Sequence, residues 1–357
     1  MFAPTRYLQW ARRFYGQVRF DLATSGIPTV PSAELRGGER VPDDPALAWE
    51  SLCRHIASHN TVDADEVLPA LGTTHALWLA CAALTSPGDE VVVEGPAYEP
   101  LVRIAEGVGA RVVTAPRDPN GFALDPGRIE RAMSPRTRAV LVSNLHNPSG
   151  TRAGADALRE VARLAEARGA SLVVDEVYAA FDDFLDASGV FRGSARHLAP
   201  NVVAVSSLTK CYGLGPERIG WLLGPKDVVE RAGDALVSSA GMLPRCHVRG
   251  GLTAFTQLPA LAARSRRLLE GKRERVARWV AAHGLSWTAP TAGLFGLVSV
   301  PGRGDLTPAI EAAAREQQVL VAPGAFFGVP GAFRLGWSLS SDLLDEGLGR
   351  LAEALEL

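Results

Sequence analysis

The feature that most constrains the fold is a series of short apolar runs that alternate with helical patterns along the middle of the chain. Within these runs apolar and polar residues do not alternate, which is typical of strands buried on both faces of a sheet. We therefore expect an α/β fold with a mostly parallel sheet covered by helices on both faces. The predicted strands are Glu90–Glu94, Arg111–Ala115, Arg138–Asn144, Ser171–Asp175, Val202–Ser206 and Ile219–Leu223.

The pattern changes near Gly241. Leu252–His283, rich in alanine, leucine and arginine, predicts one long helix. Strand and helix patterns then mix, as is typical of an α+β unit. These segments are Leu285–Val300 (strand, broken at Ala292-Gly293), Pro308–Gln318 (helix), Val319–Ala322 and Phe333–Ser338 (strands) and Ser341–Glu356 (helix).

We expect a large α/β domain over residues 46–245 and a small α+β domain over residues 246–357. Residues 1–45 are predicted to be an N-terminal arm that joins the small domain. Helices are predicted in the arm, over Trp49–His59, over Ala76–Leu84 and over Ala155–Arg168. The helix of the arm has one apolar face, made by Tyr7, Leu8, Trp10, Ala11, Phe14 and Tyr15.

Composition excludes several classes of protein. The net charge of −2 and a pI of about 6.4 give no general attraction for nucleic acid or an anionic membrane. The four cysteines form no C-x-x-C pair and no cluster with zinc-ligand spacing, so we expect no metal site and a reducing compartment. We also expect no signal peptide and no membrane span, and therefore a cytoplasmic protein.

Lys210 lies on a loop between two predicted core strands, with Ser207 three residues before it and Arg218 eight residues after it. A hydroxyl donor and an arginine are groups that bind phosphate well. We hypothesise that Lys210 carries an aldehyde cofactor as a Schiff base, and that Ser207 and Arg218 hold the phosphate of that cofactor. The alternative is a solvated lysine.

Further candidate residues follow the carboxyl ends of predicted strands, where ligands bind in such sheets. Gly72-Thr73-Thr74 opens a helix, whose free N–H groups make an anion site, although a threonine there can also be a simple helix cap. Asp175 ends a strand and can pair with a protonated pyridine nitrogen, or cap the next turn. Tyr178 can donate to the phenolic oxygen of the same ring, or be a core tyrosine.

Three other residues have weaker signals. Asn147 is fixed by the Asn147-Pro148 turn and can also donate to a phenolic oxygen, but Asn-Pro is common in turns. Tyr98, after Gly95-Pro96, can stack on a planar ring or belong to the core. His146 either supports that ring from behind or fills space.

In these motifs and their order the chain resembles the class I/II aminotransferases, fold-type-I enzymes that use pyridoxal 5′-phosphate. The resemblance covers roughly residues 20–340. The matching motifs are Gly72-Thr73-Thr74, Pro96-Ala97-Tyr98, Asn147-Pro148-Ser149-Gly150, Asp175-Glu176-Val177-Tyr178, Ser207-x-x-Lys210 with Arg218, Ala292-Gly293-Leu294-Phe295, Ala322-Pro323-Gly324 and Phe333-Arg334-Leu335.

The resemblance implies a seven-stranded sheet in the large domain, amino acid and 2-oxo acid substrates, and a homodimer with its active site at the subunit interface. It implies that Arg334 binds the substrate α-carboxylate and that the backbone of Gly26 closes over it. The remaining implied roles concern the cofactor: Lys210 forms the Schiff base, Asp175 pairs with the pyridine nitrogen, Asn147 and Tyr178 bind the phenolic oxygen, Tyr98 stacks on the ring, and Thr73, Thr74, Ser207 and Arg218 hold the phosphate.

Two segments depart from the family pattern. Gly215-Pro216 replaces the common Pro-Gly, so we expect a different loop shape before Arg218. The region Gly37-Gly38-Glu39-Arg40-Val41-Pro42 lacks the tyrosine that reaches the partner's phosphate in many members. We therefore expect that contact between subunits to be missing or replaced.

These residues are compatible with more than one reaction. An aminotransferase is the leading hypothesis. A decarboxylase, lyase or cyclase would use the same lysine, aspartate and phosphate site, because the reaction depends on which substrate bond lies perpendicular to the ring. Arg334 favours a retained carboxylate and argues mildly against decarboxylation. A non-catalytic ligand-binding protein on this scaffold is disfavoured by the full set of expected catalytic residues.

Overall fold

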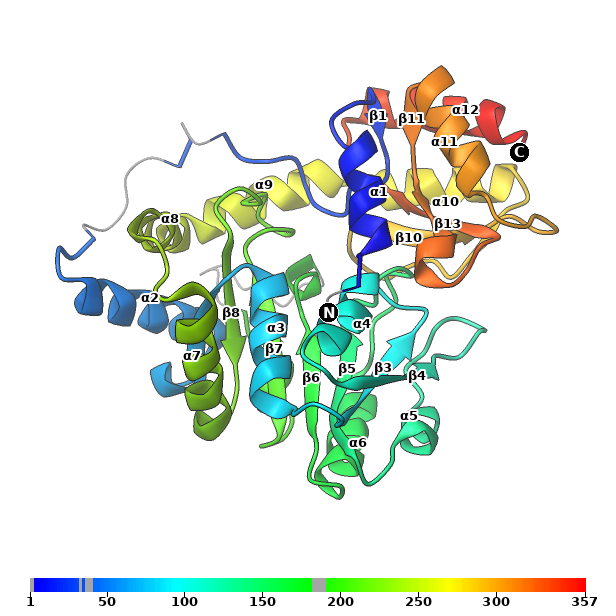
Figure 1. Cartoon of the computed structure of the whole chain (residues 1–357). Helices are drawn as coiled ribbons and strands as arrows, with labels where there is room; N and C mark the ends of the chain where they lie inside the picture. Colours follow the sequence, from blue (N-terminus) through cyan, green and yellow to red (C-terminus); the bar gives the residue numbers. More distant parts are fainter. Residues whose placement is uncertain (1–2, 32–33, 36–40, 182–190) are drawn as a thin grey trace.

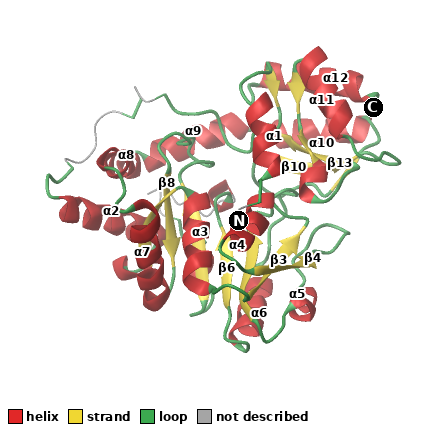
Figure 2. Ribbon diagram, in the orientation of Figure 1, coloured by secondary structure: helices red, strands yellow, loops and turns green. Residues whose placement is uncertain are grey.

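The computed structural model describes residues 3–31, 34–35, 41–181 and 191–357, and its largest element is a seven-stranded sheet (Figures 1 and 2). The strand order is β2-β8-β7-β6-β5-β3-β4, and only β8 runs antiparallel to its neighbours. The predicted mostly parallel sheet is thus confirmed. Its strands are β2 (Val67–Leu71), β3 (Glu90–Gly95), β4 (Arg111–Pro116), β5 (Thr137–Ser143), β6 (Ser171–Asp175), β7 (Val202–Ser207) and β8 (Ile219–Leu223).

The central strands are apolar throughout because each of their faces has its own core. In β3, Val91 and Val93 belong to one buried cluster, whereas Val92 belongs to another on the opposite face. The first cluster contains the buried residues of α3 (Thr73–Leu84), and the second contains most of those of α6 (Ala155–Glu166). The other helices of this part are α2 (Pro45–Asn60), α4 (Glu99–Gly107), α5 (Pro126–Ala132) and α7 (Lys226–Ala240).

A second, antiparallel sheet lies in the C-terminal part, with strand order β12-β13-β10-β9. Its core also contains residues of the N-terminal arm: Trp10 and Phe20 pack in the same cluster as Phe333 and Trp337. Figure 1 shows the arm elements α1 and β1 beside the C-terminal elements, and β1 pairs with β11. The arm thus packs in the core of the C-terminal part, whereas the predicted division of the chain into domains stays a prediction. The elements are α1 (Arg6–Phe14), β1 (Phe20–Asp21), β9 (Ser286–Trp287), β10 (Phe295–Ser299), α11 (Thr307–Glu316), β11 (Val319–Leu320), β12 (Ala322–Pro323), β13 (Ala332–Gly336) and α12 (Ser341–Leu355).

The prediction of one long helix over Leu252–His283 is wrong. Three helices lie there, α8 (Arg245–Thr256), α9 (Leu258–Leu269) and α10 (Lys272–Ala282). Pro259 lies in the first turn of α9 and cannot continue a helix from α8, because it has no N–H to donate. Gly271 has a φ of +68° and separates α9 from α10.

Other differences are smaller. The predicted strand over residues 319–322 is two short strands, because β11 pairs with β1 and β12 pairs with β13. The helices α5 and α7 were not predicted. Among the described residues, no helix is both long and apolar enough to cross a membrane.

The large sheet depends on a close approach between β8 and the turn that opens α3. A Cβ on Gly220 would lie 2.6 Å from the Cα of Gly72, a distance at which the backbone must move. We expect Gly220→Ala to lower the free energy of unfolding by roughly 1–3 kcal/mol, the usual cost of overpacking. Chemical denaturation of the purified protein measures this change.

Gly349→Ala is the matched control, because Gly349 lies inside α12 with nothing within 4 Å of an added Cβ. Alanine should raise stability there by roughly 0.5–1 kcal/mol. Equal stability of the two variants would contradict the close approach of Gly220 to Gly72.

Candidate active site

A pocket of about 230 Å³ lies at the carboxyl ends of β6 and β7, beside the N-terminus of α3. Side chains from these elements meet there because neighbouring parallel strands end at the same edge of the sheet: β6 pairs with β7 in parallel, with Asp175 opposite Val205. Nine of the residues predicted from sequence line the pocket: Thr73, Thr74, Tyr98, Asn147, Asp175, Tyr178, Ser207, Lys210 and Arg218. The other two, Gly26 and Arg334, contact members of this set, as described below.

Lys210 lies in the pocket with Gly26 against it. A Cβ on Gly26 would be 3.4 Å from Lys210 Cδ, and the N–H of Ile27 donates to the Lys210 carbonyl oxygen at 3.2 Å. Desolvation, together with the positive charges of Arg334 and Arg218, lowers the pKa of Lys210 to about 8. The amine is therefore much more nucleophilic near neutral pH than an ordinary lysine.

Asp175 is a buried carboxylate at the end of β6. Its Oδ1 accepts the N–H of Val177 at 3.0 Å, so the turn-capping alternative describes part of what it does. No lysine, arginine or histidine nitrogen of the described chain lies within ion-pair distance of it, and burial raises its pKa to about 7. A buried carboxylate without a protein cation fits a protonated ring nitrogen, which would supply the missing charge.

Tyr178 is also buried and donates to Ser25 Oγ at 2.9 Å. Burial raises its pKa, so the phenol keeps its proton and stays a donor. Ser25 was not singled out in the sequence. The only signal for it was its position beside Gly26, which the resemblance placed over the substrate.

Three groups around the N-terminus of α3 form a cradle for an anion. Thr73 Oγ1 donates to Ser207 Oγ at 2.9 Å, and Gly72, with φ +78°, allows Arg218 to approach, since a Cβ there would lie 2.6 Å from Arg218 Nη2. Arg218 makes only long hydrogen bonds, of 3.3 and 3.4 Å, to the carbonyl oxygens of Leu71 and Gly215. The described residues place no carboxylate in ion-pair range of it, so the cradle fits a phosphate.

Arg218 reaches this cradle through the Gly215-Pro216 loop with a left-handed backbone, φ +56°. The expectation that this loop differs in shape from the family stays a prediction. The segment predicted to lack a contact tyrosine lies mostly outside the described residues, at 36–40.

Arg334 is buried on β13, behind the pocket. Its guanidinium donates to Asn147 Oδ1 and to Tyr7 Oη, each at 2.8 Å, and to the carbonyl oxygen of Ala23 at 2.9 Å. Its Nε has no hydrogen-bond partner, and among the described side chains no carboxylate forms an ion pair with it. A buried cation without an acid fits a carboxylate ligand. Only 1% of the residue is exposed, so Arg334 is not a surface arginine of an edge strand.

His146 does not line the pocket. It is fully buried, with Nε2 donating to the Pro96 carbonyl oxygen at 2.8 Å and Nδ1 2.6 Å from Ser149 Oγ. Burial and the nearby Arg117 charge lower its pKa well below the usual value, so the ring is neutral. It therefore braces the loops that carry Tyr98 and Asn147.

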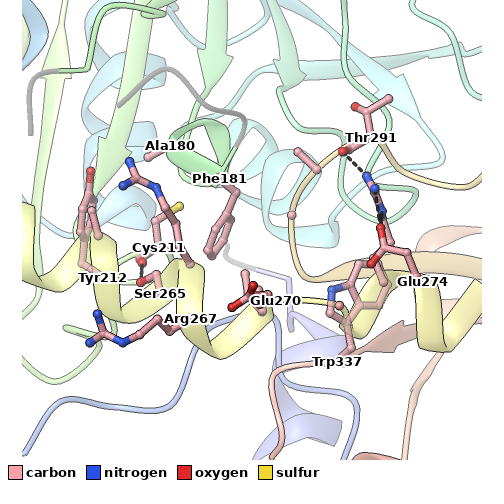
Figure 3. Close-up of a pocket in the computed structure, with 17 residues that line it drawn as sticks. Ala180, Phe181, Cys211, Tyr212, Ser265, Arg267, Glu270, Glu274, Thr291 and Trp337 are labelled. Atoms are coloured by element: carbon pink, nitrogen blue, oxygen red, sulfur yellow. Dashed lines mark hydrogen bonds and ion pairs between the residues drawn. The ribbon is translucent and has the colours of Figure 1, made fainter. Parts of the chain in front are cut away.

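A second pocket, of about 480 Å³, lies beside the residues that follow Lys210 (Figure 3). Cys211 and Tyr212 line it, and Ser265 Oγ donates to the Cys211 carbonyl oxygen. Across it, Arg273 bonds to Glu274 and to the Thr291 carbonyl oxygen. None of the predicted site residues lines this pocket, so we place the chemistry in the first one. The described residues hold no group of His, Cys, Asp and Glu side chains that could bind a metal ion.

Comparison with known proteins gives consistent matches over the chain. The family model "aminotransferase class I and II" matches residues 48–351. Capreomycidine synthase of Streptomyces vinaceus is 32% identical over 97% of this chain and 92% of its own, and aspartate/prephenate aminotransferase of Thermus thermophilus is 30% identical over 86% and 80%. The crystal structure of the PLP-dependent cyclase OrfR superposes with a TM-score of 0.84, at 25% identity over 99% of this chain and 97% of that one.

The lowered pKa of Lys210 can be tested directly, because the chain has only three lysines, Lys210, Lys226 and Lys272. In the cofactor-free protein, the rate of amine acylation at Lys210 should rise with pH to half its maximum near pH 8, since only the neutral amine reacts. Lys226, whose pKa is raised by its ion pair with Asp65, is the internal control and should react appreciably only at higher pH. Peptide mass spectrometry measures both rates.

The carboxylate of Asp175 raises the pKa of Lys210. Asp175→Asn should therefore move the midpoint for Lys210 below that of the parent protein. A midpoint near 10.5 in the parent, or an upward shift in the variant, would contradict the described environment.

Proposed function

The chain belongs to the class I and II aminotransferases, and from this premise we propose that Lys210 attaches pyridoxal 5′-phosphate as a Schiff base and that the pocket around it is the active site. The protein is a pyridoxal-phosphate-dependent aminotransferase, which exchanges an amino group between an amino acid and a 2-oxo acid. The observation that carries the assignment of the site is that an activated lysine, a buried unpaired carboxylate and an anion cradle surround one pocket.

Different residues of the pocket would bind different groups of the cofactor. Thr73, Thr74, Ser207 and Arg218 would hold its phosphate, and Tyr98 would stack on its ring. Asp175 would pair with the ring nitrogen and keep it protonated. When bound, the cofactor supplies a ring that accepts electrons from the substrate.

Asn147 and Tyr178 would hold the phenolic oxygen. The Oδ1 atom of Asn147 accepts from Arg334, which leaves its Nδ2 group as the donor toward the cofactor. Tyr178 keeps its single proton, which it donates to Ser25 in the described structure and would turn toward the phenolic oxygen of the bound cofactor. Asn147 thereby connects the arginine behind the pocket to the cofactor in front of it.

Lys210 also moves the proton of the reaction. Once a substrate amine had taken its place, its Nζ would be free to accept the proton of the substrate Cα and to give it up again within the pocket. A pKa of about 8 suits this exchange near neutral pH, because neither protonation state is strongly favoured. Arg334 would hold the substrate carboxylate meanwhile, and the backbone of Gly26 would cover it.

We also propose a cytoplasmic homodimer. The three large apolar side chains most exposed in the described chain are Leu47 on α2, Val237 on α7 and Met242 just after α7. Val237 and Met242 line an apolar hollow of about 950 Å³ between these helices, a surface that a second copy would cover. Val237→Glu should therefore give a monomer in sedimentation equilibrium, whereas Ser238→Glu, at the next, exposed position of the same helix and outside the lining of the hollow, should not; a dimeric Val237→Glu would contradict this surface.

A second candidate reaction is cyclisation. The observation in its favour is the match to the solved structure of a PLP-dependent cyclase over 99% of this chain. The proposed residue roles serve either reaction up to the removal of the Cα proton. The two reactions differ in what leaves the enzyme, and that difference can be measured.

The attachment of the cofactor tests the assignment of Lys210. The purified protein should be yellow, and borohydride reduction should add the cofactor irreversibly to the peptide that contains Lys210. Lys210→Ala should lose this attachment completely, because no other amine lines the pocket. Lys226→Ala is the matched control and should label like the parent protein. A colourless parent protein that takes up no pyridoxal phosphate would falsify the proposed function.

The reaction type is tested by mixing the yellow protein with a panel of amino acids. Stoichiometric conversion to the pyridoxamine form, with release of a 2-oxo acid, is the expected result. Release of a cyclic amino acid, ammonia or carbon dioxide without that conversion would favour the second candidate.

A further inference from the structure

We propose that Tyr7, on the N-terminal helix α1, is a positioning residue that fixes the guanidinium of Arg334 for recognition of the substrate carboxylate. This inference rests on the proposed function, in which Arg334 binds that carboxylate. Nothing in the sequence motifs points to Tyr7, because it lies outside them, on the apolar face of a short helix.

One nitrogen of Arg334, two tyrosine hydroxyls and one backbone carbonyl oxygen form a closed ring of four hydrogen bonds. Nη2 donates to Tyr7 Oη at 2.8 Å and to the Ala23 carbonyl oxygen at 2.9 Å. The hydroxyls of Tyr7 and Tyr15 are 2.7 Å apart, and Tyr15 donates to the same carbonyl oxygen at 3.3 Å. Because Tyr15 uses its proton there, Tyr7 donates to Tyr15, and the Tyr7 oxygen is left to accept from Arg334.

This ring decides which donors of Arg334 remain available to a ligand. Both N–H groups of Nη2 are used within it. Nη1 gives one N–H to Asn147, and Nε gives none, since it has no partner. The guanidinium is thus held by three acceptors, with donors still unpaired, which is the arrangement expected of a site that awaits an anion.

Tyr7 is itself held firmly at its backbone and its ring. Its N–H lies in the first turn of α1, where helical partners are missing, and it donates to Glu99 Oε2 of α4 at 2.7 Å. Its ring is 3% exposed and packs edge-on to Tyr98, with centroids 5.9 Å apart. The next residue, Leu8, lines the Lys210 pocket. Helix α1 is therefore part of the wall of the site.

Removing the hydroxyl of Tyr7 would leave an N–H of Arg334 buried without an acceptor. The guanidinium would then turn toward another acceptor, and a carboxylate would meet it in the wrong orientation. Loss of a hydrogen bond to a charged group weakens binding by roughly ten- to a hundredfold. The effect should be confined to ligands that carry a carboxylate.

The experiment compares amino acids with the amines that lack only the carboxylate. The holoenzyme and its Tyr7→Phe variant are titrated with L-alanine and ethylamine, L-leucine and 3-methylbutylamine, and L-arginine and agmatine, and each Kd is read from the absorbance of the bound cofactor. In Tyr7→Phe, the Kd of the amino acid should rise at least tenfold, whereas that of the amine should change less than threefold. The cofactor content should be unchanged.

Two further variants complete the design. Tyr212→Phe is the matched control, because Tyr212 is buried and its hydroxyl has no hydrogen-bond partner among the described residues; both Kd values should stay as in the parent. Tyr15→Phe removes the group that accepts the proton of Tyr7, so it should raise the amino acid Kd in the same direction by a smaller factor. It tests the same ring if Tyr7→Phe does not fold.

Equal weakening of amino acid and amine in Tyr7→Phe would overturn the proposal, as would an unchanged amino acid Kd. A lower amino acid Kd would also overturn it, because Tyr7 would then be competing with the carboxylate for Nη2. Arg334→Lys separates this failure from that of the proposed function. If that variant keeps the affinity for the amino acid, the role of Arg334 is wrong and this inference falls with it. If it loses the affinity while Tyr7→Phe does not, only this inference is wrong.

Discussion

The structure depends on buried charges that the described chain leaves without an ion-pair partner. Asp175 and Lys210 line one pocket, Arg334 contacts its lining residue Asn147, and none of the three forms a salt bridge with a described residue. The chain is able to pair buried charges: Arg117 and Glu94 are buried 2.6 Å apart, and Ser143 donates twice to the same carboxylate. An isolated buried charge costs several kcal/mol. Bound groups of complementary charge would therefore stabilise the site, and a cationic ring nitrogen beside Asp175 and a substrate carboxylate at Arg334 would meet this need.

Two parts of the chain bring these charges together. In the large sheet, β6 and β7 are parallel and end at the same edge. This places Asp175 and the Lys210 loop beside the first turn of α3. Arg334 comes from the other sheet, and its core is completed by the N-terminal arm, through Trp10 and Phe20. The arm also provides Gly26 against Lys210 and Tyr7 against Arg334. The proposed recognition of substrate is thus connected to the packing of the N-terminal arm on the C-terminal part.

Much of the fold could be predicted because burial on both faces leaves a direct trace in the sequence. Valine runs such as Val91–Val93 face two cores and show no polar alternation, so their strands were found to within a residue or two. The prediction of one long helix was wrong because the composition of the segment favours helix throughout, whereas Pro259 and the left-handed Gly271 divide it into separate helices. The short strands β11 and β12 were predicted as one strand, because the local sequence does not show that they pair with different strands.

The sequence by itself determined the fold class and the residue types of the proposed cofactor site, because a lysine, an aspartate and an arginine placed together at strand ends have few other uses. Only the tertiary structure decided what surrounds Arg334. Its contacts to Tyr7, Ala23 and Asn147 join residues more than 180 positions away in the chain, and no local pattern encodes such a distance. The packing of α1 on the C-terminal core creates them, since Tyr7 is buried against β13 only when that core is formed.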